Sequence, residues 1–214
     1  MIYEFCAENL TDLSKAHQAG AHRIEICDNL AVGGTTPSYG VIKEALKQAL
    51  PVQVLIRPRG GNFVYNPQEI AAMKTDMTMA LQLGVDGLVF GCLTPDNQLD
   101  KSLILEFLSL ISEGRKKPDL VFHMAFDQIP AEEQKLAINW LANHGFSRIL
   151  TRGGQAGDTL ETRSANYRRL LEIAGSRITI LAGGGITLSN RQDLVQKTGL
   201  RELHGTQIVF EKGD

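Results

Sequence analysis

The chain has 214 residues, of which 43% are hydrophobic and 21% are charged, and its formal net charge is −2. This length suffices for one well-buried core and is short for two, so we expect a single domain over residues 1–214. The weak net charge gives no reason to expect a nucleic-acid partner, and no run of 18 apolar residues predicts a membrane span. The expected partner is therefore a small anionic molecule or an ion.

Eight short β-type runs alternate with amphipathic stretches along the chain. The predicted strands are 2–6, 23–27, 52–57, 87–90, 119–123, 147–151, 177–182 and 202–205, and the predicted helices are 10–19, 39–50, 67–83, 101–111, 131–142, 164–174 and 189–197. Strict alternation favours a parallel sheet with right-handed crossovers, and eight units is the number that closes a barrel. The sequence thus predicts an α/β fold, the TIM (β/α)8 barrel.

The eighth outer helix of this barrel is predicted to be short or absent. Only residues 206–214 follow the last predicted strand. The barrel would lack this cover or borrow it from a partner subunit in a homo-oligomer.

The first two predicted strands end in matching triplets, 4–6 (Glu-Phe-Cys) and 25–27 (Glu-Ile-Cys). Because strand side chains alternate between faces, Glu4 shares a face with Cys6, and Glu25 shares one with Cys27. Barrels bind their ligands at the carboxyl ends of the strands. Two carboxylates and two thiols are therefore expected at one mouth.

The third predicted strand ends in two arginines, Arg57 and Arg59, separated by a proline. Two guanidinium groups at the mouth can bind carboxylate or phosphate oxygens. The glycines that follow would place the loop 60–63 over the opening. A plainer interpretation is that the arginines neutralise Glu4 and Glu25, because buried charges need partners.

An imidazole and a carboxylate follow the fifth predicted strand, at His123 and Asp127. Asp127 could orient the ring, and a histidine near carboxylates is suited to proton transfer near neutral pH. A lone histidine at a strand end is more often structural, but here other ionisable groups converge on it. The candidate catalytic residues are Glu4, Glu25, His123 and Asp127.

Three consecutive glycines, Gly183, Gly184 and Gly185, follow the seventh predicted strand. Barrels often bind phosphate at the loops after strands seven and eight, through glycine amides. The same glycines could merely form a tight turn into the next helix. The candidate ligand-binding residues are Arg57, Arg59, Thr151, Gly183, Gly184, Gly185 and His204.

As a set, these residues resemble the CutC copper homeostasis family over nearly the whole chain. The matching segments are 23–27, 33–38, 56–61, 87–91, 122–123, 125–127 and 183–186. The resemblance implies a cytosolic TIM barrel linked by name to copper handling, with no agreed reaction. The chain departs from the family at Met124, where arginine is usual, at Asn62, where aspartate is usual, and in its shorter C-terminal segment.

Copper(I) binding is the first functional hypothesis. Copper(I) is soft and prefers sulfur donors, and the metal ligands would be Cys6 and Cys27 on adjacent strands. Met124 could add a thioether, although a methionine that fills the core is the plainer interpretation. Buried cysteines are also commonly just small hydrophobic residues. Three cysteines without zinc-finger spacing fit a reducing compartment, and hence a cytoplasmic location.

The alternative hypothesis is an enzyme of the lyase or isomerase type, acting on a small phosphorylated or carboxylated compound. Arg57, Arg59 and the loop 183–185 would hold the anion while Glu25 or His123 moves a proton. An inactive barrel serving as an interaction scaffold is a third reading. The convergence of so many ionisable groups on one end argues against it.

Overall fold

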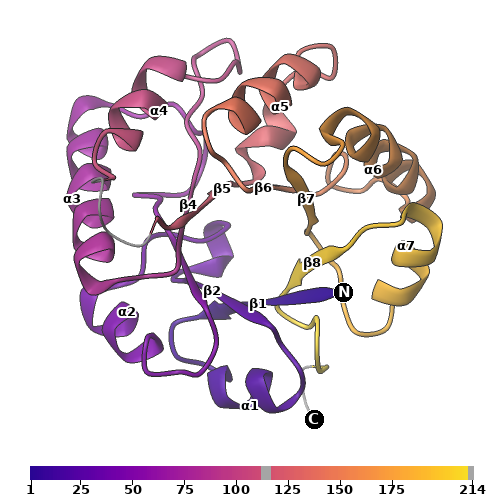
Figure 1. Cartoon of the computed structure of the whole chain (residues 1–214), viewed down its shortest axis with the longest axis horizontal. Helices are drawn as coiled ribbons and strands as arrows, with labels where there is room; N and C mark the ends of the chain where they lie inside the picture. The colour runs from indigo at the N-terminus through magenta and orange to yellow at the C-terminus, as the bar shows by residue number, and fades with distance from the viewer. Residues whose placement is uncertain (112–116, 212–214) are drawn as a thin grey trace.

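Eight parallel strands close into a barrel surrounded by helices (Figure 1). The structure is a computed structural model that describes residues 1–111 and 117–211. Each strand pairs with its successor in the chain, and β8 pairs with β1 to close the barrel. The predicted fold class, a single-domain TIM barrel, is therefore confirmed.

The elements lie close to their predicted places. The strands are β1 (Ile2–Glu8), β2 (Arg23–Cys27), β3 (Val52–Leu55), β4 (Gly87–Phe90), β5 (Asp119–Phe122), β6 (Arg148–Thr151), β7 (Thr179–Ala182) and β8 (Glu202–Gly205). The helices are α1 (Leu13–Gln18), α2 (Tyr39–Ala45), α3 (Pro67–Leu83), α4 (Lys101–Leu108), α5 (Gln134–Asn143), α6 (Leu160–Ala174) and α7 (Arg191–Thr198), with short 3-10 helices η1 (Leu30–Val32) and η2 (Met124–Gln128).

Local capping explains where two of the helices begin. The Asn66 side chain accepts a hydrogen bond from the Glu69 amide, and the Glu69 carboxylate accepts one from the Asn66 amide, so α3 begins at the predicted residue. Helix α6 begins four residues earlier than predicted. The reason is that Thr159 accepts a hydrogen bond from the Thr162 amide and caps the helix there.

The chain after β8 covers the flank where an eighth helix would stand. Within the described residues no helix follows β8, as predicted. Ile208, Val209 and Phe210 are buried instead, and the Phe210 ring lies 5.3 Å from the Phe5 ring of β1. Residues 212–214 of the predicted tail lie outside the described part. Throughout residues 1–111 and 117–211, no helix is both long and apolar enough to cross a membrane.

A network of charged side chains fills the amino-terminal end of the barrel. Arg23 binds Glu4 and Glu202, the latter at 2.7 Å. Arg148 binds Glu202 and Asp119, each at 2.8 Å. An apolar layer lies above this network and comprises Cys6, Cys27, Leu55, Val89, Val121, Leu150 and Leu181. Side chains thus fill the barrel interior at its amino-terminal end, which leaves the carboxyl ends of the strands as the place for a cavity.

Substitution of Phe210 by alanine tests the structural role of the tail. We expect Phe210→Ala to lower the free energy of unfolding by about 3 kcal/mol, because it leaves a cavity against Phe5. Urea denaturation measures this change. The control Leu136→Ala removes a side chain that is 62% exposed and should cost less than about 0.5 kcal/mol. Equal effects of the two substitutions would show that the tail does not complete the core.

Candidate functional site

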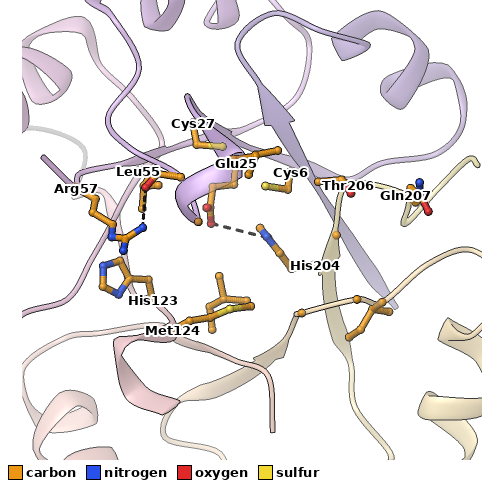
Figure 2. A pocket seen from close by; sticks show the side chains of 18 of the residues that line it. Cys6, Glu25, Cys27, Leu55, Arg57, His123, Met124, His204, Thr206 and Gln207 are labelled. Carbon is orange, nitrogen blue, oxygen red and sulfur yellow. Dashed lines mark hydrogen bonds and ion pairs between the residues drawn. The ribbon is translucent and has the colours of Figure 1, made fainter. Parts of the chain in front are cut away.

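A cavity of about 380 Å³ lies at the carboxyl ends of the strands. Figure 2 shows its side chains pointing inward from strands at both ends of the sequence. The loops after β7 and β8 complete its wall. The labelled lining residues are Cys6, Glu25, Cys27, Leu55, Arg57, His123, Met124, His204, Thr206 and Gln207.

Strand register brings a thiol, a carboxylate and an imidazole together on the cavity floor. Cys6 of β1 is the register partner of Glu25 of β2. On the other side of β1, Glu4 is the register partner of His204 in β8. The Cys6 sulfur, a Glu25 carboxylate oxygen and a His204 ring nitrogen all lie within 4.8 Å of one another. All three side chains are buried, so they interact with little screening by solvent.

Glu4 lies beneath this group and is itself fully buried. Its carboxylate accepts hydrogen bonds from Arg23 Nε and from His204 Nδ1, the latter at 2.8 Å. Burial alone would raise the pKa of Glu4, but Arg23 and His204 outweigh that effect and lower it to about 2. Glu4 is therefore an ionised carboxylate that fixes the orientation of the His204 ring.

Glu25 has the opposite electrostatic environment. Its Oε2 atom has no hydrogen-bond partner and lies 3.9 Å from His204 Nδ1. Burial raises the pKa of Glu25 to about 7; the His204 and Arg23 charges oppose this rise, and the Glu4 charge adds to it. Burial lowers the pKa of His204, but the Glu25 and Glu4 carboxylates reverse that effect and raise it. Glu25 can therefore change protonation near neutral pH, beside a His204 ring whose protonated form the two carboxylates favour.

The two sequence-predicted thiols meet beside this pair. A hydrogen bond with the Cys27 thiol, together with burial, raises the pKa of Cys6 well above its ordinary value. The Cys27 sulfur also contacts the Ala7 carbonyl oxygen at 3.4 Å. Cys6 is therefore a neutral thiol unless a cation replaces its proton.

Arg57 lines the cavity, but its guanidinium group mainly joins two loops. Nη1 donates to the carbonyl oxygens of Val32 and Gly34, at 3.1 and 2.9 Å, and Nη2 donates to that of Gly61 at 2.9 Å. Its Nε atom has no hydrogen-bond partner. Arg57 thus holds the wall of the cavity in place, and its role in ligand binding stays a prediction.

Arg59 points away from the cavity. Its guanidinium group forks onto the Glu69 carboxylate at the start of α3, with Nε 2.6 Å from Oε1. The arginines were expected, in the plainer interpretation, to neutralise the strand-end glutamates. The structure differs, because Arg23 pairs with Glu4 instead. Arg23 could have been found in the sequence, since it lies two residues before Glu25 and so shares its strand face.

His123 and Asp127 belong to different cavities. His123 lines the main cavity, and its Nδ1 accepts a hydrogen bond from the Ala125 amide at 3.1 Å. Burial, assisted by Arg57, lowers the pKa of His123 to about 3, so the ring is neutral. Asp127 accepts hydrogen bonds from the Thr151 hydroxyl and the Arg152 amide, beside a separate cavity of about 280 Å³. Asp127 therefore orients the loop after β6, and Thr151 lies with it outside the main site.

The glycine loop contributes backbone to the wall of the main cavity. Gly184 and Gly185 line it, both with positive φ angles of 72° and 81°. At Gly183 a β-carbon would lie 2.7 Å from Met124 Cε, so a larger residue there would displace the Met124 side chain. Met124 and the loop residues Thr206 and Gln207 also line the cavity. Strand alternation alone could not have assigned those two loop residues.

Known proteins resemble the chain along nearly its full length. It matches the CutC family over residues 1–209. The family protein CutC of Enterococcus faecalis is 51% identical over 213 residues, which cover 98% of this chain and 100% of that protein. The copper homeostasis protein cutC homolog of Homo sapiens is 42% identical over 205 residues, 95% of this chain and 72% of that protein.

Solved structures agree with this similarity. The crystal structure of the copper homeostasis protein CutC from Streptococcus agalactiae superposes with a TM-score of 0.91 at 48% identity and covers 97% of this chain and 99% of that one. The aldolase QR15 superposes with a TM-score of 0.69 at 17% identity, covering 98% of this chain and 91% of that one. The latter likeness concerns the barrel fold alone.

The Glu25 environment predicts a pH dependence of stability. Because the pKa of Glu25 is about 7 in the folded chain against an ordinary 4.5, the folded chain holds this proton more tightly than the unfolded chain. This tighter proton binding stabilises the folded chain by roughly 3 kcal/mol below about pH 4.5, and the stabilisation is lost as the pH rises through 7. Loss of the proton on His204, whose pKa is also raised, lowers the stability in the same pH direction. The other ionisable groups that face Glu25 are Arg23, Glu4 and Cys6.

Urea denaturation of the wild type and of Glu25→Gln from pH 5 to 8 measures this contribution. The stability of the wild type relative to the variant should fall as the pH rises. Glu132→Gln, at an exposed position, is the control and should track the wild type. Parallel curves for the wild type and Glu25→Gln would contradict the account of the Glu25 environment.

Proposed function

The chain belongs to the CutC family, and on that premise we propose that it binds copper(I) through Cys6 and Cys27 as part of copper homeostasis. The observation that carries the proposal is the meeting of two buried thiols on the floor of an open cavity. Copper(I) is a soft ion and is held by thiolate and thioether sulfur. The ion would enter from the carboxyl ends of the strands.

The surroundings of the two thiols support this assignment. Met124 lines the same cavity and offers a thioether as a further soft donor. The Glu25 carboxylate lies beside Cys6 and can offset positive charge when a cation arrives. Cys6, Cys27 and Cys92 are all free and buried, which supports the cytoplasmic location that goes with the proposal.

Competition titration with copper(I) under anaerobic conditions tests the two thiols. We expect Cys6→Ser and Cys27→Ser each to weaken copper(I) binding by at least about tenfold, because each removes a sulfur ligand. Cys92→Ser is the matched control, since it changes a buried thiol outside the cavity, and should bind as the wild type does. Unchanged affinity in both cavity variants would overturn the proposal.

The cavity volume favours a second candidate function, the binding and conversion of a small phosphorylated or carboxylated compound. About 380 Å³ is far more space than one ion needs and lies in the range of small-molecule sites. Gly184 and Gly185 present backbone to this space, and Thr206 adds a hydroxyl-bearing side chain. Glu25 and His204 are the groups placed to move a proton on such a compound.

A thermal-shift screen of small phosphates and carboxylates tests this second candidate. A compound present at 100 times its Kd should stabilise the metal-free protein by about 2.7 kcal/mol and raise its Tm. Thr206→Val should reduce the shift because it removes a polar group from the cavity, whereas Thr75→Val on the exposed surface of α3 should not. Failure of every such compound to raise the Tm would exclude this candidate.

A further inference from the structure

We propose that Cys6, Glu25 and His204 form a second kind of metal site, a centre for a divalent ion of the zinc type with a coordination position open to the cavity. This centre differs from the copper(I) pair in its ligands, because it uses one sulfur, one oxygen and one nitrogen. The two sites share Cys6 but not Cys27. The inference goes beyond the proposed copper function and can hold or fail without it.

The geometry of the three side chains suits a tetrahedral ion. Their donor atoms lie within 4.8 Å of one another, and Glu25 and His204 point toward each other with Cys6 alongside (Figure 2). Ligands about 2.0 to 2.3 Å from a tetrahedral zinc ion lie roughly 3.5 Å apart. Small side-chain rotations would close that difference. Three protein ligands with a fourth position left open are the usual arrangement of catalytic zinc sites.

An oxygen atom without a hydrogen bond is a second, independent observation that favours a cation at this point. Glu25 is 4% exposed, and its Oε2 atom has no hydrogen-bond partner. The nearby guanidinium groups are engaged elsewhere, Arg23 by two other carboxylates and Arg57 by backbone carbonyls. A buried carboxylate oxygen without a hydrogen bond is costly, and a bound cation would remove that cost.

Glu4 prepares the imidazole for this role. A neutral His204 ring that donates its Nδ1 proton to Glu4 carries its lone pair on Nε2. Because Nδ1 is the ring nitrogen that lies 3.9 Å from Glu25, the Glu25 side chain would rotate toward Nε2 to share the ion. Metal-binding histidines are commonly held in this way by a carboxylate, which fixes the tautomer and the ring orientation. Glu4 is therefore a positioning residue and not a ligand, in keeping with its place beneath the cavity.

The charge and the chemistry of the donors favour a divalent ion. On binding, the proton of the Cys6 thiol and any proton on Glu25 pass to solvent, so the remaining thiolate and carboxylate neutralise the two positive charges. Mixed sulfur, nitrogen and oxygen donors are typical of zinc, whereas copper(I) favours sulfur. The open position would accept an oxygen atom of a small carboxylate or carbonyl compound in the cavity and polarise it.

Cobalt(II) provides a spectroscopic probe of this centre in the whole 214-residue chain. Titration of the metal-free chain with Co²⁺ should produce a thiolate-to-cobalt charge-transfer band and the visible bands of a four-coordinate ion, at one ion per chain. Cys6→Ser should abolish the charge-transfer band, and Glu25→Gln should weaken Co²⁺ binding at least about tenfold. Cys27→Ser and Cys92→Ser should both keep the spectrum. Added acetate should shift the visible bands if a position is open.

The outcomes separate this centre from the copper(I) pair. A charge-transfer band that is lost in Cys27→Ser but survives in Glu25→Gln would overturn the proposal, as would the absence of any band in the wild type. If acetate leaves the visible bands unchanged, the proposal that one coordination position is open would be wrong. Copper(I) affinity should instead fall strongly in Cys27→Ser, which removes a ligand, and only slightly in Glu25→Gln, which removes a neighbouring charge. The isosteric variant Glu25→Gln removes a buried charge, and its thermal unfolding curve verifies that it is folded.

Discussion

The buried carboxylate of Glu4 is the constraint on which the rest of the site depends. A fully buried charge needs partners of opposite charge, and Glu4 takes both Arg23 and the His204 ring. Arg23 is therefore engaged by Glu4 and Glu202 beneath the cavity. Glu25, which lies in the same kind of strand position as Glu4, is left with an unpartnered oxygen. Two similar strand ends thus acquire opposite properties: the Glu4 carboxylate is ionised at neutral pH, whereas the Glu25 carboxylate readily takes up a proton.

The barrel supports this asymmetry through its layered interior. The ion pairs of Arg23 and Arg148 with Glu202 close the amino-terminal end. The apolar layer above them contributes residues such as Leu55 and Leu150 to the cavity wall. Polar groups on the floor are consequently shielded from solvent on one side and accessible from the other. That combination strengthens electrostatic interactions and still admits a ligand. The tail residues up to Phe210 complete the enclosure without an eighth helix.

Features governed by strand alternation could be predicted from the sequence, whereas features governed by competition between side chains could not. Alternation placed Cys6, Glu25 and His204 at one end of the barrel, and the Asn66 cap fixed the start of α3. The loops behaved differently. Arg59 reaches the Glu69 carboxylate, which belongs to a helix ten residues further along, and Asp127 reaches Thr151 in the next strand. Each of these contacts depends on where the fold places a distant segment of the chain. The spacing of residues in the sequence does not give that position.

The position of a bound copper ion tests the central claim most directly, which is that the buried thiols on the cavity floor receive the metal. A crystal of the reduced protein, loaded with copper(I) without oxygen, would give an anomalous scattering peak at the copper absorption edge. The account predicts one strong peak between the sulfur atoms of Cys6 and Cys27. A peak confined to surface residues, with none on the cavity floor, would contradict it.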